Sequence, residues 1–131
     1  MLNTLRKRLR SEKGFTLIEL LVVMIILAIL TAIAIPSYLS FKDRANKSAA
    51  GADVRSIIPS VESYFSDNGT YSGMTVSNLK TNYDQAINLS LYTLGAGTQT
   101  ATNYCIQATS QNQTAAKNGP SAAIVIGGTC T

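Results

Sequence analysis

One apolar stretch constrains this chain more than any other feature of its sequence. The stretch from Phe15 to Ile35 contains 21 residues, and Glu19 is the only charged residue among them. An α-helix rises about 1.5 Å per residue, so a helix of this length covers roughly 30 Å, the thickness of a bilayer's hydrocarbon layer. The segment predicts a membrane-spanning helix with one carboxylate near its start.

The flanking charges predict how this helix is oriented. Five basic residues precede it, and no Ala-x-Ala cleavage site with a polar mature start follows it, as an ordinary secretory signal would require. Basic residues beside a membrane helix favour the cytoplasmic side. We therefore expect the N-terminus in the cytoplasm and the remainder exported. The basic residues are Arg6, Lys7, Arg8, Arg10 and Lys13.

The start of the apolar stretch carries a recognisable signature. Residues 13–20 read Lys-Gly-Phe-Thr-Leu-Ile-Glu-Leu, so that Glu19 is the fifth residue after Gly14. This sequence resembles the type IV prepilin signature. The resemblance implies that a prepilin peptidase cuts between Gly14 and Phe15, removing residues 1–14 as a leader. It also implies methylation of the new Phe15 amine.

The composition changes once this leader is set aside. The sequence has 11 basic and 7 acidic residues, and residues 1–14 contain five of the basic residues and one of the acidic residues. The remaining chain has six of each and is neutral in its side chains. The basic balance therefore belongs to the leader and gives no support to nucleic-acid binding by a basic surface.

Glu19 is costly in a membrane helix, by about 2–3 kcal/mol on insertion scales. Cleavage after Gly14 would expose the α-amino group of Phe15 about one helical turn away, where the two charges could pair. The resemblance implies that Glu19 neutralises the N-terminal amine of a neighbouring subunit during assembly. A carboxylate that only reaches the lipid headgroups is the alternative.

The helical pattern continues beyond the membrane segment. Apolar residues recur at spacings of three and four, which places them on one helix face. We expect one helix from about Phe15 to about Phe65, ended by Asp67-Asn68-Gly69, where Gly69 can adopt the left-handed conformation. The stripe comprises Val54, Ile57, Ile58, Val61, Tyr64 and Phe65.

Two prolines lie inside this predicted helix. Pro36 and Pro59 each remove one backbone donor, so each should kink or loosen a turn. The resemblance implies that the helix can lose helicity around Pro36 when it packs in a filament, which makes Pro36 a candidate assembly residue. A static bend at the membrane exit is the alternative.

The C-terminal part predicts a small sheet. Residues 89–94, 104–109 and 122–126 contain β-branched or aromatic residues and lie between glycine-containing turns. We expect an α+β, pilin-like fold in which a small antiparallel sheet packs on the long helix. The expected division is a leader (1–14), a hydrophobic half-helix (15–41) and a globular head (42–131).

Cys105 and Cys130 are the only cysteines, and both lie in the part expected to be exported. A disulfide between them is expected, and it would stabilise a small domain by roughly 3 kcal/mol. Two thiols acting as metal ligands would lack partners, because the chain has no His and no carboxylate after Asp84. The predicted loop between the cysteines has its exposed tip at residues 111–118.

No catalytic motif stands out, and we expect neither an enzyme nor a cofactor or metal site. The sequence favours a structural subunit of a type IV pilus-like filament that polymerises with its own copies through residues 15–41. The implied partners are the membrane before assembly, the prepilin peptidase and an inner-membrane assembly machinery. The implied location is the cytoplasmic membrane first and an extracellular filament afterwards.

Two other functions stay open. A pseudopilin of a type II secretion system shares the leader and the long helix, but its head commonly holds calcium in a C-terminal loop. Residues 85–131 contain no Asp or Glu, which suits calcium poorly. A membrane-anchored binding domain that never polymerises is the second alternative, although a simple anchor has no use for Glu19.

Overall fold

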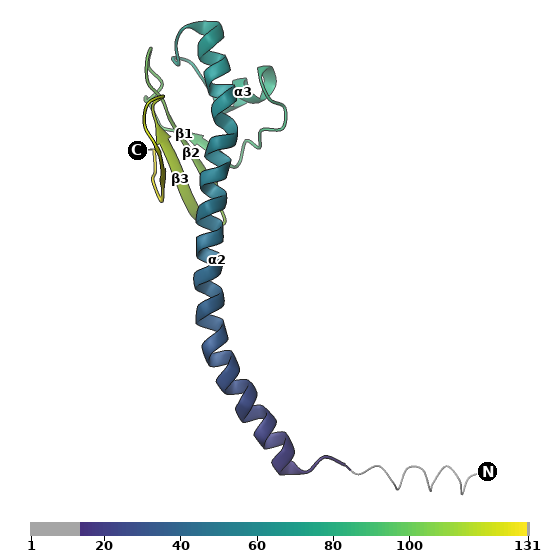
Figure 1. The fold of residues 1–131 in the computed structure, drawn as a ribbon. Coiled ribbons are helices and arrows are strands. Elements are labelled where there is room, and N and C mark those ends of the chain that lie inside the picture. The colour runs from purple at the N-terminus through teal and green to yellow at the C-terminus, as the bar shows by residue number, and fades with distance from the viewer. Residues whose placement is uncertain (1–13, 131) are drawn as a thin grey trace, which may run out of the picture. The chain divides into compact units, whose positions relative to one another are not determined.

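The computed structural model describes residues 14–130, so the expected leader lies outside the described residues except for Gly14. One helix, α2, runs over Leu17–Asn68, which confirms the predicted long helix to within a few residues (Figure 1). It continues without interruption through Pro36 and Pro59. Gly69 ends it with a φ of 66°, and its N–H donates to the carbonyl of Phe65, as expected of a helix stop.

Contacts divide the chain into two units, which meet between Leu39 and Ser40. In the first unit the described residues are mainly helical, and every residue from 14 to 39 is exposed. By length and composition, α2 contains a segment that could cross a membrane. The second unit contains the rest of α2, a short helix and the sheet.

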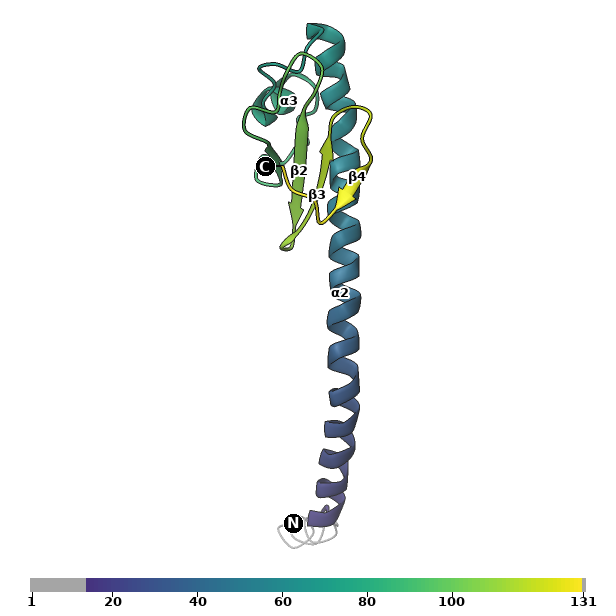
Figure 2. The ribbon, with the colours of Figure 1, turned by 90° about the vertical axis from the view of Figure 1, so that its left-hand side faces the viewer.

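The sheet has four antiparallel strands in the order β1-β2-β3-β4 (Figure 2). Their bounds are Tyr92–Leu94 for β1, Cys105–Ser110 for β2, Gln113–Asn118 for β3 and Ile124–Ile126 for β4. Three of them confirm the predicted strands, although β1 and β4 are shorter than expected. Hydrogen-bonded turns replace the first residues of the predicted strand 89–94, since the N–H of Leu91 donates to the carbonyl of Asn88.

The predicted exposed tip at residues 111–118 is wrong. Only Gln111 and Asn112 form the turn, with φ values of 49° and 65°, and the following residues form β3. This strand contains two alanines, a lysine and an asparagine, which are residue types of low strand propensity. Ala115 is nevertheless fully buried opposite Ala108, because small side chains are needed where the sheet packs on α2.

A short helix, α3 (Val76–Asn82), was not predicted. Thr75 caps its N-terminus, since the Thr75 hydroxyl oxygen accepts a hydrogen bond from the N–H of Asn78 at 3.1 Å. Such a cap stabilises a helix by about 1 kcal/mol. Leu79 is the buried residue of α3 and joins it to the core.

The core lies between the second part of α2 and the sheet. Val54, Ile57 and Val61 of the predicted stripe are fully buried, whereas Ile58, Tyr64 and Phe65 are partly buried at its margin. Tyr92 of β1 joins the two layers, because its hydroxyl donates to the carbonyl of Asp53 at 3.1 Å. The sheet side of the core is formed by Tyr92, Tyr104, Ile106, Ala108 and Ala115.

Candidate functional site

The first turn of α2 holds Glu19, one of the residues that the sequence assigned to assembly. Thr16 is the residue before the helix, and its backbone N–H and hydroxyl both donate to one oxygen of Glu19, at 2.8 Å each. The N–H of Glu19 points back to the Thr16 hydroxyl oxygen at 3.3 Å. This reciprocal arrangement is a capping box, and it satisfies backbone donors that a helix start leaves open.

The capping box gives Glu19 a local role that sequence reasoning missed. The pattern Thr16-x-x-Glu19 could have revealed it, because Ser or Thr followed three residues later by Glu marks a helix start. A carboxylate in the first turn also interacts favourably with the positive end of the helix dipole. Glu19 is therefore held at the very start of the apolar segment.

Gly14 and Phe15 precede this turn. A Cβ atom placed on Gly14 would meet no atom within 4 Å, and the backbone there is not in the left-handed region. No packing contact in the described chain therefore requires glycine at this position. Phe15 is 93% exposed, so the peptide bond between the two residues is not shielded by the fold.

The surface that follows is apolar and uncovered. The large side chains between Leu17 and Phe41 are all exposed within the single chain, including those on both sides of Pro36. An apolar surface of this extent exceeds what a soluble monomer usually shows to water. It can be buried only against lipid or against other protein.

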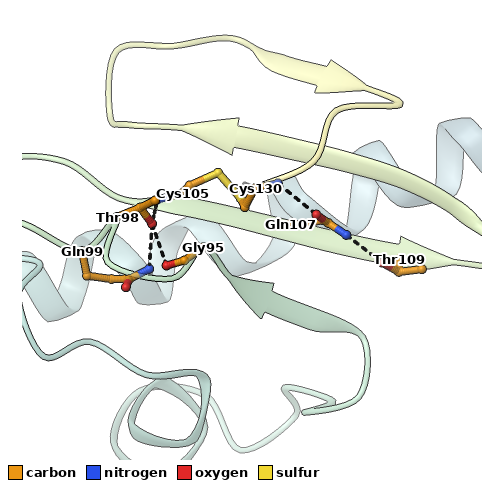
Figure 3. Close-up of a disulfide and its surroundings, with 7 residues drawn as sticks. All are labelled: Gly95, Thr98, Gln99, Cys105, Gln107, Thr109 and Cys130. Atoms are coloured by element: carbon orange, nitrogen blue, oxygen red, sulfur yellow. Dashed lines mark hydrogen bonds between the residues drawn. A yellow bond between two sulfur atoms is a disulfide. The ribbon is translucent and has the colours of Figure 1, made fainter.

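In the head, the disulfide between Cys105 and Cys130 is confirmed (Figure 3). It joins the first residue of β2 to the segment after β4, with an S–S distance of 1.98 Å. The N–H of Cys130 also donates to the side-chain oxygen of Gln107 at 3.0 Å. The chain between the cysteines is not a loop, because most of the sheet lies within it.

Glu62 of α2 binds two core tyrosines. The hydroxyl of Tyr71 donates to one carboxylate oxygen at 3.0 Å, and that of Tyr104 donates to the other at 3.4 Å. Burial, together with the nearby carboxylate, raises the pKa of Tyr71 to about 12 and raises the pKa of Tyr104 as well. Both tyrosines stay protonated at neutral pH. Tyr104, which directly precedes β2, links α2 to the sheet, and Tyr71 links α2 to the connection that leads to α3.

Lys117 is a buried cation that sequence reasoning missed. It lies in β3 and is 8% exposed. Its ammonium group donates to the carbonyl of Pro120 at 3.0 Å and to the carbonyl of Ala122. Lys117 thereby holds the connection between β3 and β4 in place, and its charge is bound by backbone dipoles.

None of these groups forms a catalytic or metal-binding arrangement. Within residues 14–130, no three His, Cys, Asp or Glu side chains come together in a way that could hold a metal ion. The two cysteines in that range are bonded to each other.

Two protein families match the chain. The family described as "Prokaryotic N-terminal methylation motif" matches residues 9–35. The family described as "Type IV minor pilin ComP, DNA uptake sequence receptor" matches residues 36–124, more than half of the sequence.

Individual relatives resemble mainly one half of the chain. The chain is similar to the type IV wide pilus major component PilA4 of Thermus thermophilus, with 44% identity over 64 residues, covering 49% of each protein. It is 42% identical over 61 residues to the type IV major pilin PilA of Myxococcus xanthus, covering 47% of this chain and 28% of that protein. The type II secretion system core protein G of Pseudomonas aeruginosa is 40% identical over 62 residues, covering 47% and 44%. The matched segment thus spans less than half the length of each of these relatives.

Proposed function

Because the chain belongs to the type IV pilin family, we propose that it is a structural subunit of a surface filament and polymerises with copies of itself. The observation that carries this proposal is the exposed apolar helix surface from Leu17 to Phe41, with the capped Glu19 at its beginning. In lipid this surface is covered before assembly. In a filament it is covered by the same helix of neighbouring subunits.

Burial alone does not drive the transfer from membrane to filament, because lipid is as apolar as a helix bundle. Close packing and charge pairing must supply the preference. In the proposed mechanism, cleavage between Gly14 and Phe15 creates an amine beside Glu19, and this carboxylate neutralises the amine of a neighbouring subunit. Pro36 provides a turn with one backbone hydrogen bond fewer, at which the helix can adapt during packing.

The processing site is proposed from three observations. The methylation-motif family covers residues 9–35, which include both residues of the bond. Gly14 has no packing contact that would require a glycine at this position, and Phe15 is almost fully exposed. A residue without a side chain at the bond is suited to a peptidase active site, where a larger residue would collide.

We further propose where each segment of the chain resides and that the chain is not an enzyme. Residues 1–14 act as a leader on the cytoplasmic side, residues 15–41 form the filament core, and residues 42–131 form the exported head. The precursor resides in the cytoplasmic membrane and the product is an extracellular filament. Pilins and pseudopilins are structural subunits. We therefore propose that this chain is also a structural subunit, without enzymatic activity.

A type II secretion pseudopilin is the second candidate, favoured by the similarity to core protein G. DNA binding, which the second family's description names for that family, is not part of the proposal. Lys117, the basic residue of the sheet, is buried. The chain without residues 1–14 has as many acidic as basic residues, so it has no net positive charge to attract phosphates.

The proposal is tested by replacing Gly14 with a bulky residue such as Leu in producing cells. The variant precursor should stay in the membrane, and surface filaments should be absent. The control is Thr102→Leu, which introduces the same side chain at an exposed residue outside the processing motif. Filaments built from unprocessed Gly14→Leu subunits would overturn the proposed processing step.

A further inference from the structure

Two asparagines of the chain are followed directly by glycine, in the pairs Asn68-Gly69 and Asn118-Gly119. In such a pair the backbone nitrogen of the glycine can attack the side-chain carbonyl carbon of the asparagine, because glycine has no side chain that hinders a close approach. Asparagine is accordingly one of the thermolabile residue types. The two pairs share the same chemistry, so a difference between them must come from the fold.

The fold holds the first pair in place. Asn68 is the last residue of α2, and its side-chain amide donates to the carbonyl of Tyr64 at 2.8 Å. The N–H of Gly69, which carries the attacking nitrogen, donates to the carbonyl of Phe65 at 2.7 Å. Attack at Asn68 therefore requires the end of the helix to open first.

The second pair lacks these hydrogen bonds. Asn118 is the last residue of β3, and it is exposed. Among residues 14–130, no hydrogen bond holds its side-chain amide, and the N–H of Gly119 donates to no acceptor. The attacking nitrogen and the group that it attacks are thus both unbound at the point where the chain leaves the sheet.

The fold also requires glycine at position 119. Gly119 has a φ of 91°, in the left-handed region that favours glycine, and a Cβ atom placed on it would collide with the side chain of Asn103. This turn begins the connection from β3 to β4 (Figure 2). A larger residue that would slow the attack cannot replace Gly119 without distorting the turn.

We propose that Asn118 is a site of spontaneous deamidation in the folded protein, whereas Asn68 is protected. The nitrogen of Gly119 forms a bond to the side-chain carbonyl carbon of Asn118, and the bond from that carbon to the amide nitrogen breaks. The amide leaves as ammonia together with the proton of the Gly119 N–H, and a cyclic imide remains. Water then opens the imide at either of its carbonyls, which yields aspartate or isoaspartate. No oxidant or reductant takes part.

The position suits each step of this reaction. Ring closure joins two neighbouring residues, so the burial of Gly119 does not prevent it. The water reacts at Asn118, which is exposed. The inference goes beyond the proposed function and does not depend on it, because deamidation requires neither cleavage of the chain nor a filament.

Deamidation changes the charge of the head where it carries least. Lys117 is the one charged side chain among residues 85–131, and its ammonium is bound by the carbonyls of Pro120 and Ala122. The product adds a carboxylate at the next residue, on a chain whose side chains are neutral without residues 1–14. Isoaspartate also routes the main chain through the side-chain carbon, which lengthens the connection that Lys117 holds. The surface charge of the head therefore becomes more negative as the protein ages.

The test uses the full chain in detergent micelles, incubated at mildly alkaline pH in heavy-oxygen water. Each deamidation during the incubation incorporates a heavy oxygen, so the peptide mass distinguishes it from earlier deamidation. The peptide with Asn118 should give two labelled products, aspartate and isoaspartate. The peptide with Asn68 should react at least about tenfold more slowly, because two hydrogen bonds must break first.

The unfolded chain provides the control for this comparison. After the disulfide is reduced and the chain is unfolded in denaturant, Asn68 and Asn118 should react at similar rates, because each is then followed by an unrestrained glycine. Equal rates in the folded protein would overturn the inference. An Asn118 peptide that reacts when unfolded but stays unlabelled when folded would overturn it too.

Asn118→Gln tests the same site through charge. Glutamine keeps the amide at this exposed residue but must close a larger ring, so the acidic form that isoelectric focusing detects after incubation should be lost. The matched control Asn78→Gln makes the same change at an exposed asparagine that is followed by leucine, and it should form the acidic species as the wild type does. An acidic form that persists in Asn118→Gln would contradict the assignment to Asn118.

Discussion

The carboxylate of Glu19 accepts hydrogen bonds from both the backbone N–H and the hydroxyl of Thr16, each 2.8 Å long. The same carboxylate is the proposed partner of the Phe15 amine after processing. Glu19 therefore has one role that depends on hydrogen bonding at the helix start and a second that depends on negative charge.

Glu19→Gln separates these two roles. Glutamine also occurs at this position of a capping box, so it keeps the helix start but removes the charge. If charge pairing drives assembly, Glu19→Gln and Glu19→Ala should both accumulate processed subunit and yield few filaments, since losing one member of a buried pair costs roughly 3–5 kcal/mol. Quantifying sheared filaments against total processed subunit measures this.

Thr16→Ala provides the matched control for the same turn. It removes the capping hydroxyl and keeps the charge, at a cost of about 1 kcal/mol. Its filament yield should stay close to that of the wild type. If Glu19→Gln subunits assembled normally, the charge of Glu19 would not be needed for assembly, and capping would remain as its role.

Lys117→Met removes the ammonium group and retains a side chain of similar length. The carbonyls of Pro120 and Ala122 would lose their hydrogen bonds to the ammonium, and a hydrogen bond to a charged group contributes about 1.5–3 kcal/mol. We expect the head, expressed from Lys42, to melt at a lower temperature and to be cut faster by protease within residues 119–123. Lys47→Met, at an exposed lysine, should change neither property; equal behaviour of the two variants would contradict the proposed role of Lys117.

The raised pKa of Tyr71 predicts that the folded head loses stability in alkali. Its pKa is raised in the folded head to about 12, above the ordinary value of 10.0. The stabilisation is complete below the unfolded pKa and is lost as the pH rises from there through the folded pKa, because the unfolded chain releases this proton first.

Tyr71→Phe should remove this part of the alkaline loss. Near neutral pH the variant lacks the hydrogen bond to Glu62 and should be less stable by about 0.5–1.5 kcal/mol. The difference in melting temperature between wild type and variant should shrink as the pH approaches about 11. A difference that stays constant or widens would show that Tyr71 does not titrate as the fold implies.

Calcium distinguishes the pilin proposal from the secretion pseudopilin. Calcium sites normally include carboxylates, and residues 85–131 contain none in their side chains. The head should melt at the same temperature with calcium and with a chelator. An increase of several degrees with calcium would indicate that Asp67 or Asp84 completes a site, and it would favour the pseudopilin.

The long helix could be predicted because its determinants are local. The apolar run, the three-and-four spacing around Val54 and Val61, and the stop at Gly69 all lie within the helix or beside it. The disulfide could also be predicted, since only two cysteines exist. Gly14 and Glu19 were recognised through a motif of eight adjacent residues.

The missed elements depend on partners far along the chain. Ala115 resembles neither a strand residue nor a core residue, and it becomes both because β2 pairs with it and its side chain joins the core against α2. Lys117 looks like a surface lysine until the connection to β4 folds back to its ammonium. Thr16 differs from these residues, because its capping role depends only on the local pattern Thr16-x-x-Glu19.

Mass spectrometry of the subunit recovered from sheared filaments tests processing and assembly together. We expect the N-terminal peptide to begin at Phe15, with methylation on its amine, and no peptide from residues 1–14 to accompany it. Filaments whose subunits retain an intact Met1 to Gly14 would contradict this expectation.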